Sequence, residues 1–241
     1  MRFLPLLLFS ILLTCTNCTA KKEEHNRLSQ EEQAAGWHLL FDGNSLHGWH
    51  LYNKGDTASK WTANGGELVC DPKKKEGIFG DLVTDSLYRD FELALEWKVA
   101  KGGNSGVFLN VQEDSRFAAT FATGLEMQLL DNENAEHRHQ IDSTHWAGCL
   151  YAVACSGQRS KPHAYNNWNK SRIVQKNGKV SFWLNDMLTF EDDVQSEAFQ
   201  QGIQQSGMKA YPQFGKYASG HIALQNHTDS VAFRNIKIRR L

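Results

Sequence analysis

The chain has 241 residues, of which 41% are hydrophobic and 22% charged, a balance typical of a globular protein with a sizeable core. Its formal net charge of −1 offers no basic footprint for nucleic acid, so we expect no nucleic-acid partner. Seven tryptophans and six tyrosines supply rings of the kind that stack on sugars as well as in cores. The composition is therefore compatible with a carbohydrate partner.

Residues 1–18 are interpreted as a lipoprotein-type signal peptide. The run MRFLPLLLFSILLTC has a positive start and an apolar stretch too short to span a bilayer. Cys15 and Cys18 lie in a setting that loosely resembles a bacterial lipoprotein box, and the pattern leaves open which one is lipidated. We expect a soluble protein secreted across the inner membrane of a Gram-negative bacterium. It would be lipid-anchored in the periplasm or on the outer-membrane surface, touching the membrane only through that anchor.

Residues 19–36 are predicted to form a tether that ends in a short helix. Ser29 followed three residues later by Glu32 is a capping box, and Gly36 is a helix stop, which predicts a helix over residues 30–35. A second short helix is predicted near residues 197–204.

The rest of the chain shows strand patterns. Residues 91–99 alternate apolar and polar side chains, so the apolar set should face a core. Residues 171–184 read as a hairpin with Asn177-Gly178 at its tip. In the last strand, 230–239, the apolar parity changes, which predicts a β-bulge at Arg234-Asn235.

Short strands with little helix and no internal repeat predict an all-β fold. We expect residues 37–241 to form one domain, a β-sandwich of two curved antiparallel sheets with one or two short helices. The concave face of one sheet would carry the polar residues described next.

The stretch from Gly102 to Asp131 is the strongest candidate for a site. It contains GGNSGVFLN and then GLEMQLLD, two predicted strands. On a flat strand Glu126 and Gln128 share a face while Asp131 points the other way. A bulge near Leu129-Leu130 would return Asp131 to the same side and give a site with two carboxyls and an amide. The alternative is a sheet edge with solvated polar residues.

A polar loop, EHRHQIDSTH, follows Asp131 and supplies three histidines. His137 and His139 are interpreted as solvated, whereas His145, beside Trp146, is a candidate acid or base. Three imidazoles near carboxylates leave a divalent metal open, although the spacing matches no strong metal signature and no cofactor is certain.

Further candidates for substrate binding come later in the chain. Trp168 is a sugar platform or a core residue, and Lys161 is a possible cation for a ligand oxygen or an ordinary surface lysine. Gln225 and His227 end a strand and are candidates for the concave face. Cys149 and Cys155 either form a disulfide that closes a loop or are small buried hydrophobic residues. Because the globular part has three cysteines, including Cys70, at least one of them stays unpaired or pairs between chains.

Several motifs together resemble the secreted bacterial 3-keto-disaccharide hydrolase domain family, a concanavalin-like jelly roll. They are WHLLFDGNSLHGWH, DFELALEWKVAKGGNSGVFLN, GLEMQLLD, HWAGCLY, KPHAYNNWNKSRI and PQFGKYASGHIALQNHTDSVAFRNIKIRRL, in this order over nearly all of residues 37–241. The NSG motif adds Asn104 and Asn110 to the substrate-binding candidates, and HWAGCLY adds Tyr151.

The resemblance implies a carbohydrate-active enzyme that cleaves 3-keto glycosides or disaccharides by elimination or hydrolysis. The ketone acidifies the C2 proton, so a base can remove it, the enolate is stabilised and the aglycone leaves. Glu126 or His145 is the expected base, with Asp131 and Gln128 holding substrate hydroxyls or a metal. Two alternatives remain: a non-catalytic carbohydrate-binding module, and a conventional glycosidase that uses two carboxylates.

Overall fold

The computed structural model describes residues 25–241, so the predicted signal peptide, both N-terminal cysteines and the start of the tether lie outside the described residues. The strands are β1 (His38–Leu39), β2 (Trp49–Leu51), β3 (Trp61–Asn64), β4 (Glu67–Cys70), β5 (Leu82–Thr84), β6 (Phe91–Val99), β7 (Asn104–Val111), β8 (Leu125–Leu130), β9 (Asn169–Lys176), β10 (Lys179–Leu184), β11 (Met187–Asp193), β12 (His221–Leu224) and β13 (Val231–Arg240). The helices are α1 (Gln30–Ala34), α2 (His137–Gln140) and α3 (Glu197–Gln205), with short 3₁₀ turns η1 (Thr120–Ala122), η2 (Ser143–His145), η3 (Gly157–Arg159) and η4 (Gly207–Ala210).

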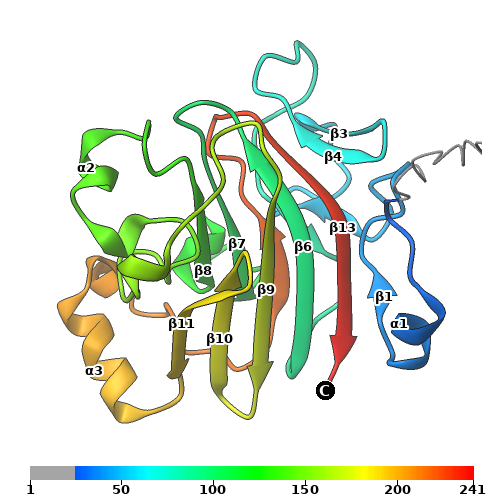
Figure 1. The fold of residues 1–241 in the computed structure, drawn as a ribbon. Helices are drawn as coiled ribbons and strands as arrows, with labels where there is room; N and C mark the ends of the chain where they lie inside the picture. Colours follow the sequence, from blue (N-terminus) through cyan, green and yellow to red (C-terminus); the bar gives the residue numbers. More distant parts are fainter. Residues whose placement is uncertain (1–24) are drawn as a thin grey trace, which may run out of the picture.

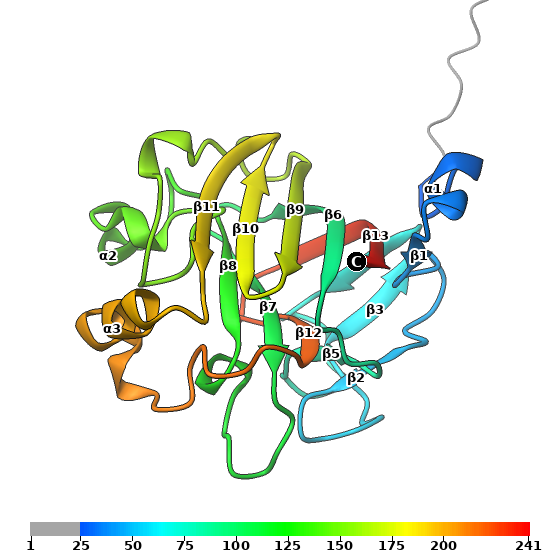
Figure 2. The ribbon, with the colours of Figure 1, turned by 90° about the horizontal axis from the view of Figure 1, so that it is seen from below.

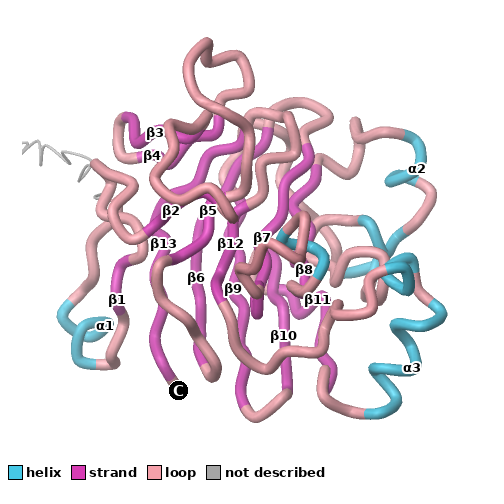
Figure 3. Tube along the Cα trace, turned by 180° about the vertical axis from the view of Figure 1, so that it is seen from behind, coloured by secondary structure: helices cyan, strands magenta, loops and turns pink. Residues whose placement is uncertain are grey.

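Within residues 25–241 the strands form two antiparallel sheets. One has eight strands in the order β11-β10-β9-β6-β13-β4-β3, with β1 paired to β13; the other has five in the order β2-β5-β12-β7-β8. Figure 1 looks onto the eight-stranded sheet, and Figure 3 shows the opposite side, with the five-stranded sheet toward the viewer. The two sheets confirm the predicted all-β jelly-roll sandwich.

Strand β6 shows why the sheets pack face to face. Phe91, Leu93, Leu95, Trp97 and Val99 are all buried and belong to the main core cluster. Burying one such side chain contributes about 1.5–3 kcal/mol, so a single alternating strand supplies much of the driving force. Facing side chains of β7 and β8 complete the same cluster from the five-stranded sheet.

The local predictions agree with the structure. Ser29 and Glu32 make both hydrogen bonds of the capping box at the start of α1. Asn177 and Gly178 have positive φ angles, as the predicted hairpin turn requires. The register of β13 against β6 shifts after Arg234, which confirms the bulge.

The helices lie at the two ends of the sandwich. Helices α2 and α3 lie beside β8 and β11, whereas α1 lies at the β1 and β13 end (Figures 1 and 2). None of the helices in residues 25–241 has the length and apolar character needed to cross a membrane.

Candidate active site

Strand β8 directs Glu126 and Gln128 away from the sandwich interior. Their strand neighbours Leu125, Met127 and Leu129 belong to the core cluster between the sheets, so alternate side chains point to the opposite face. Glu126 is only 5% exposed and Gln128 only 1%. The prediction that these two polar groups share one face is therefore confirmed, and both are buried there.

A cavity of about 200 Å³ lies over this face. It is lined by Asn104, Phe121, Glu126, Gln128, Tyr151, Met208, Tyr211, Gln225 and His227. Five of these were predicted as substrate-binding residues: Asn104, Gln128, Tyr151, Gln225 and His227. Cavities that bind drug-sized ligands span about 300–1,000 Å³, so this one suits a single sugar ring.

Several buried polar atoms around the cavity have no hydrogen-bond partner within the described part of the chain, although His227 Nδ1 lies 3.8 Å from Asp229 Oδ2. They are Asn104 Oδ1, both amide atoms of Gln128, Gln225 Oε1 and His227 Nδ1. A buried polar atom without a hydrogen bond costs about 1–3 kcal/mol, so several of them around one cavity indicate a place for a polar ligand or water. A larger hollow of about 480 Å³ lies on the outer face of the other sheet, where Arg172, Glu96 and Lys237 of its wall form ion pairs with other residues.

Gly106 makes room for the Glu126 carboxyl. It lies on β7 directly opposite Gln128, and a Cβ atom at this position would lie 2.1 Å from Glu126 Oε1. Any other residue would displace the carboxyl group. The glycine of the NSG motif is thus explained by the space that Glu126 needs.

The environment of Glu126 favours its neutral form. Burial raises its pKa well above the ordinary value, and the nearby Asp81 carboxylate adds to the increase. Burial also raises the pKa of Asp81, which accepts hydrogen bonds from Thr120 Oγ1 and from the Asn226 backbone. An acid with a raised pKa becomes a stronger base once it is deprotonated.

The HWAGCLY motif forms the wall of the cavity beside β8. Gly148 N donates to Gln128 O, Gln128 N donates to Cys149 O, and Tyr151 N donates to Glu126 O. These backbone bonds hold Tyr151 beside Glu126. A disulfide joins Cys149 to Cys155 and closes the loop that follows, which decides between the two interpretations of these cysteines, whereas Cys70 is free and buried.

His145 contacts this wall through the ring of Tyr151. Its ring stacks on Tyr151 with centroids 4.6 Å apart, but His145 is not part of the cavity lining. His139 packs against it at 5.0 Å and is only 2% exposed, so the prediction that His139 is solvated is wrong. Burial lowers the pKa of His139 to about 4, and the ring is therefore neutral at pH 7. His137 is exposed, as predicted.

Asp131 lies outside this cavity because the predicted bulge is absent. The pairing of β7 with β8 keeps one register from Asn104 opposite Leu130 to Leu109 opposite Leu125. Asp131 Oδ2 instead accepts hydrogen bonds from Gly102 N and Asn134 Nδ2 at 2.9 Å each. Asp131 therefore stabilises the turn before β7. Lys161 lines the same separate hollow as Asp131, not the cavity at Glu126.

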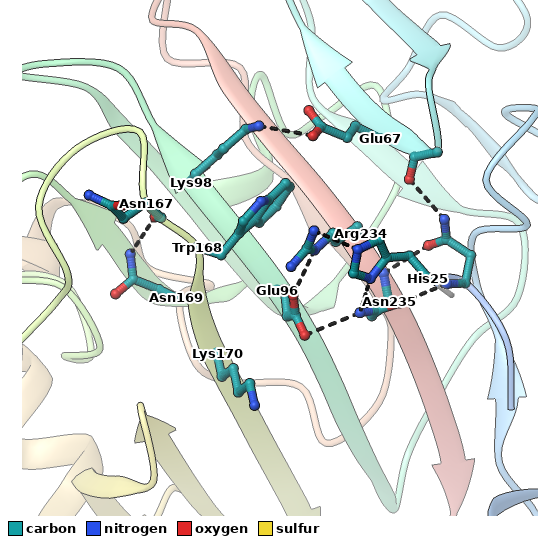
Figure 4. Close-up of polar contacts among 12 residues, drawn as sticks. His25, Glu67, Glu96, Lys98, Asn167, Trp168, Asn169, Lys170, Arg234 and Asn235 are labelled. Carbon is teal, nitrogen blue, oxygen red and sulfur yellow. Dashed lines mark hydrogen bonds and ion pairs between the residues drawn. The ribbon is translucent and has the colours of Figure 1, made fainter. Parts of the chain in front are cut away.

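Two other predicted binding residues, Asn110 and Trp168, make structural contacts away from the cavity. Asn110 exchanges amide hydrogen bonds with Gln175 of the facing sheet at 2.8 and 3.0 Å, so its side chain joins the two sheets in the interior. Trp168 packs against Lys98 and Arg234 on the eight-stranded sheet, with the cations 4.4 and 4.1 Å from the ring centroid (Figure 4). Neither residue lines the cavity.

Three lining residues were missed by sequence reasoning. Phe121 comes from η1, and Met208 and Tyr211 come from η4 and the residue after it. Phe121 and Tyr211 contact each other edge to face, with ring centroids 5.2 Å apart. They lie in irregular segments without hydrophobic periodicity, so only tertiary structure brings them to β8.

Residues 25–241 contain no set of side chains that would form the metal centre left open by the sequence. No group of three or more His, Cys, Asp or Glu side chains in that range is placed to hold an ion.

Comparison with known proteins agrees with this geometry. A family model described as the 3-keto-alpha-glucoside-1,2-lyase-like domain matches residues 36–239. The chain belongs to this family. A "3-keto-disaccharide hydrolase" of Bacteroides thetaiotaomicron is 30% identical over 245 residues, which cover 92% of this chain and 84% of that protein.

Solved structures show the same lyase-like domain fold. A proposed glycosyl hydrolase from Parabacteroides distasonis has 31% identity and a TM-score of 0.82, and the match covers 90% of this chain and all of that one. A second from the same organism has 24% identity and a TM-score of 0.63, over 85% and 99% of the two chains, and supports the fold alone. The family match, the B. thetaiotaomicron relative and the first of these two structures support a carbohydrate-active function for this chain.

Proposed function

We propose that this protein cleaves 3-keto glycosides, with Glu126 as the base that removes the C2 proton. The observation that carries the proposal is the buried Glu126 carboxyl in a cavity of sugar-ring size, surrounded by unpaired amide and imidazole atoms. The family of the chain and the name of its B. thetaiotaomicron relative agree with a 3-keto sugar as substrate.

The proposed reaction is an elimination followed by addition of water. Glu126 takes the C2 proton, and the electrons of that bond move to the C3 oxygen as an enolate. Donors such as Gln128 Nε2 stabilise this oxygen while it is charged. The enolate then collapses to the ketone, a C1–C2 double bond forms, and the C1–O bond breaks. The aglycone leaves with a proton, and water adds across the double bond to give the free 3-keto sugar.

Tyr151 is the proposed proton donor to the aglycone. It lines the cavity and is held beside Glu126 by a backbone hydrogen bond. Burial raises the pKa of its hydroxyl, so the group stays protonated at neutral pH. His145, stacked on Tyr151, is assigned the positioning of that ring rather than a direct contact with substrate.

A conventional glycosidase mechanism has less support from this geometry. It requires two carboxyl groups that flank the scissile bond, about 5–9.5 Å apart. Among the described residues that line the cavity, Glu126 alone carries a carboxyl group, and Asp131 lines a different hollow. The nearby Asp81 does not line the cavity, and its carboxylate accepts hydrogen bonds from Thr120 Oγ1 and Asn226 N. Elimination needs a single carboxylate because the ketone supplies the acidity.

The test compares two substrates. The protein is incubated with a 3-keto glucoside and with the matching unoxidised glucoside, with and without chelator. Release of aglycone from the 3-keto glucoside alone is expected. Equal release from both would support a two-carboxylate glycosidase, and binding of sugar without release from either would support a binding module.

We propose, in addition, that the enzyme is exported and lipid-anchored through Cys15 or Cys18. The apolar leader with its following cysteines motivates this proposal. Mass spectrometry of the protein from membranes of a Gram-negative host should find a diacylglyceryl modification on one of the two cysteines. Unmodified protein in the soluble fraction would contradict it.

A further inference from the structure

The outer face of the eight-stranded sheet carries more basic than acidic side chains on its three central strands. Strands β9 and β13 contain no acidic residue, and alternation directs six basic side chains outward: Lys170, Arg172, Lys176, Arg234, Lys237 and Arg239. Strand β6, which lies between them, contributes Glu92 and Glu96. Glu92 pairs with Arg172 and Arg239, Glu96 pairs with Arg234, and Lys237 pairs with Glu32. The excess of positive charge on these strands is therefore small and includes Lys170.

A hollow of about 480 Å³ lies in this basic face, and a small residue creates it. Ala94 of β6 lies directly opposite Arg172 of β9 and Lys237 of β13. Trp183 pairs with Arg172 on the next strand, and Leu39 pairs with Lys237 on the other side. One row of five strands therefore has a methyl group at its centre and long side chains on both sides.

Arg172 is held rigidly at the wall of the hollow. Its guanidinium lies 4.2 Å from the centroid of the Trp183 ring, and its Nε donates to Glu92 Oε1. Glu92 also accepts hydrogen bonds from Arg239. One carboxylate therefore pairs with two guanidinium groups, and this group of three side chains carries one net positive charge. The Nη1 and Nη2 atoms of Arg172 donate to no group within residues 25–241. A preoriented fork of free donors is the arrangement that binds a carboxylate in a bidentate manner.

The remaining wall combines a free cation with acceptors. The Lys170 side chain is exposed, and its ammonium makes no hydrogen bond or ion pair with any residue that the structure describes; Figure 4 draws no dashed contact to it. Glu96 and Asp186 also line the hollow. Glu96 already accepts hydrogen bonds from Arg234 Nε and Asn235 Nδ2, whereas Asp186 accepts none from residues 25–241 and can accept hydrogen bonds from hydroxyl groups. Cations beside such acceptors fit a ligand that carries one carboxylate and several hydroxyls.

We infer that this hollow is a second binding site, separate from the cavity at Glu126, for an acidic sugar of the uronate class. Arg172 and Lys170 bind the carboxylate, Ala94 forms the floor under the ring, and Asp186 accepts hydroxyl hydrogens. The hollow has more than twice the volume of the cavity at Glu126 and accommodates a disaccharide. It opens on the opposite sheet, so the site holds an acidic glycan without blocking the cavity at Glu126.

The test uses digalacturonate and the neutral digalactoside of the same linkage, titrated by calorimetry at low salt. We expect the acidic disaccharide to bind at least tenfold more tightly. Ala94→Leu fills the hollow and should weaken binding of digalacturonate at least tenfold, whereas the matched Ala94→Ser should retain it. Arg172→Lys keeps the charge, loses the fork and should also weaken binding at least tenfold.

Two controls distinguish this site from the cavity at Glu126 and from simple attraction of anions. Glu126→Gln changes the other cavity and should leave the affinity for digalacturonate unchanged. Loss of digalacturonate binding in this variant would place the sugar in the cavity at Glu126 and overturn the inference. Equal affinity for both disaccharides, full binding by Ala94→Leu, or displacement by equimolar inorganic phosphate would also overturn it. Thermal unfolding of each variant identifies any loss caused by misfolding.

Discussion

At the scale of single residues, the account depends on Glu126. Replacing it with glutamine keeps the size of the side chain and its burial but removes the base. We expect Glu126→Gln to lower kcat on a 3-keto glucoside about 10²- to 10⁴-fold, the usual contribution of general base catalysis. Steady-state kinetics checks this, with Glu197→Gln, at an exposed position at the start of α3, as the matched control. Unchanged turnover by Glu126→Gln would remove the residue from the mechanism.

The raised pKa of Glu126 also predicts a pH dependence of activity. The base acts only when deprotonated, so kcat/KM should rise with pH through an apparent pKa above the ordinary value of a glutamate. A pH–rate profile of the wild-type protein measures this limb. A profile that is already flat at pH 4.5 and above would contradict the assignment.

The same shift predicts a pH dependence of stability. The folded protein binds the Glu126 proton more tightly than the unfolded chain, so its stability is greatest below the unfolded pKa and falls as pH rises toward the folded pKa. Each pKa unit of elevation corresponds to about 1.4 kcal/mol. Urea unfolding at several pH values should show wild type losing stability relative to Glu126→Gln between about pH 4 and the folded pKa. A constant difference across that range would contradict the burial argument.

At the scale of elements, the pairing of β7 with β8 positions the site. Gly106→Ala should displace the Glu126 carboxyl, because the added Cβ would lie 2.1 Å from Oε1. Displacement of a catalytic group from its working position lowers kcat about 100-fold. The fold should survive, because the flexible Glu126 side chain can move away from the added methyl group. Kinetics and circular dichroism together check this.

The matched control for Gly106→Ala is Gly202→Ala. Gly202 lies inside α3, and a Cβ there would contact nothing within 4 Å. We expect unchanged activity and a gain in stability of about 0.5–1 kcal/mol from the better helix former. Full activity in Gly106→Ala would show that Glu126 does not need its observed position.

The segment beside β8 yields a prediction for the disulfide. Cys149 and Cys155 are six residues apart, and closing so short a loop is worth about 2 kcal/mol in the chain-entropy model. A reducing agent should lower the Tm of the wild type and leave a Cys149→Ser/Cys155→Ser variant unaffected. An equal shift in both proteins would assign the effect to something other than this bond.

At the scale of the whole molecule, alternation predicted the layers well. Period-two patterns placed the apolar side chains of residues 91–99 in the core and put Glu126 and Gln128 on one face. These assignments depend only on backbone geometry, which each strand fixes for itself. The hairpin at Asn177-Gly178 and the bulge after Arg234 were found for the same reason.

The rest depended on tertiary contacts that no local pattern contains. Asp131 was expected in the site through a bulge, but the turn before β7 takes its carboxylate instead. Asn110 has a polar side chain on a site strand, yet its partner Gln175 lies in the other sheet. Phe121 and Tyr211 reach the cavity from irregular segments. The family motifs added Asn104 and Tyr151, which line the cavity, but also Asn110, which does not.

The two hollows open on opposite outer faces of the sandwich, which predicts that they act independently. Ala94→Leu should leave kcat/KM for a 3-keto glucoside within about twofold of wild type, because distant sites without shared partners are additive. A large loss of activity in this variant would show that the faces are coupled.

The central claim is that cleavage begins with removal of the proton at C2. It is tested most directly with a 3-keto glucoside that carries deuterium at C2, incubated in ordinary water, with the free 3-keto sugar incubated alone to measure spontaneous exchange. Removal of the C2 proton by Glu126 should give a primary isotope effect on kcat/KM and a product that loses its deuterium faster than the spontaneous exchange. A product that keeps the deuterium, formed at the same rate as from unlabelled substrate, would contradict it.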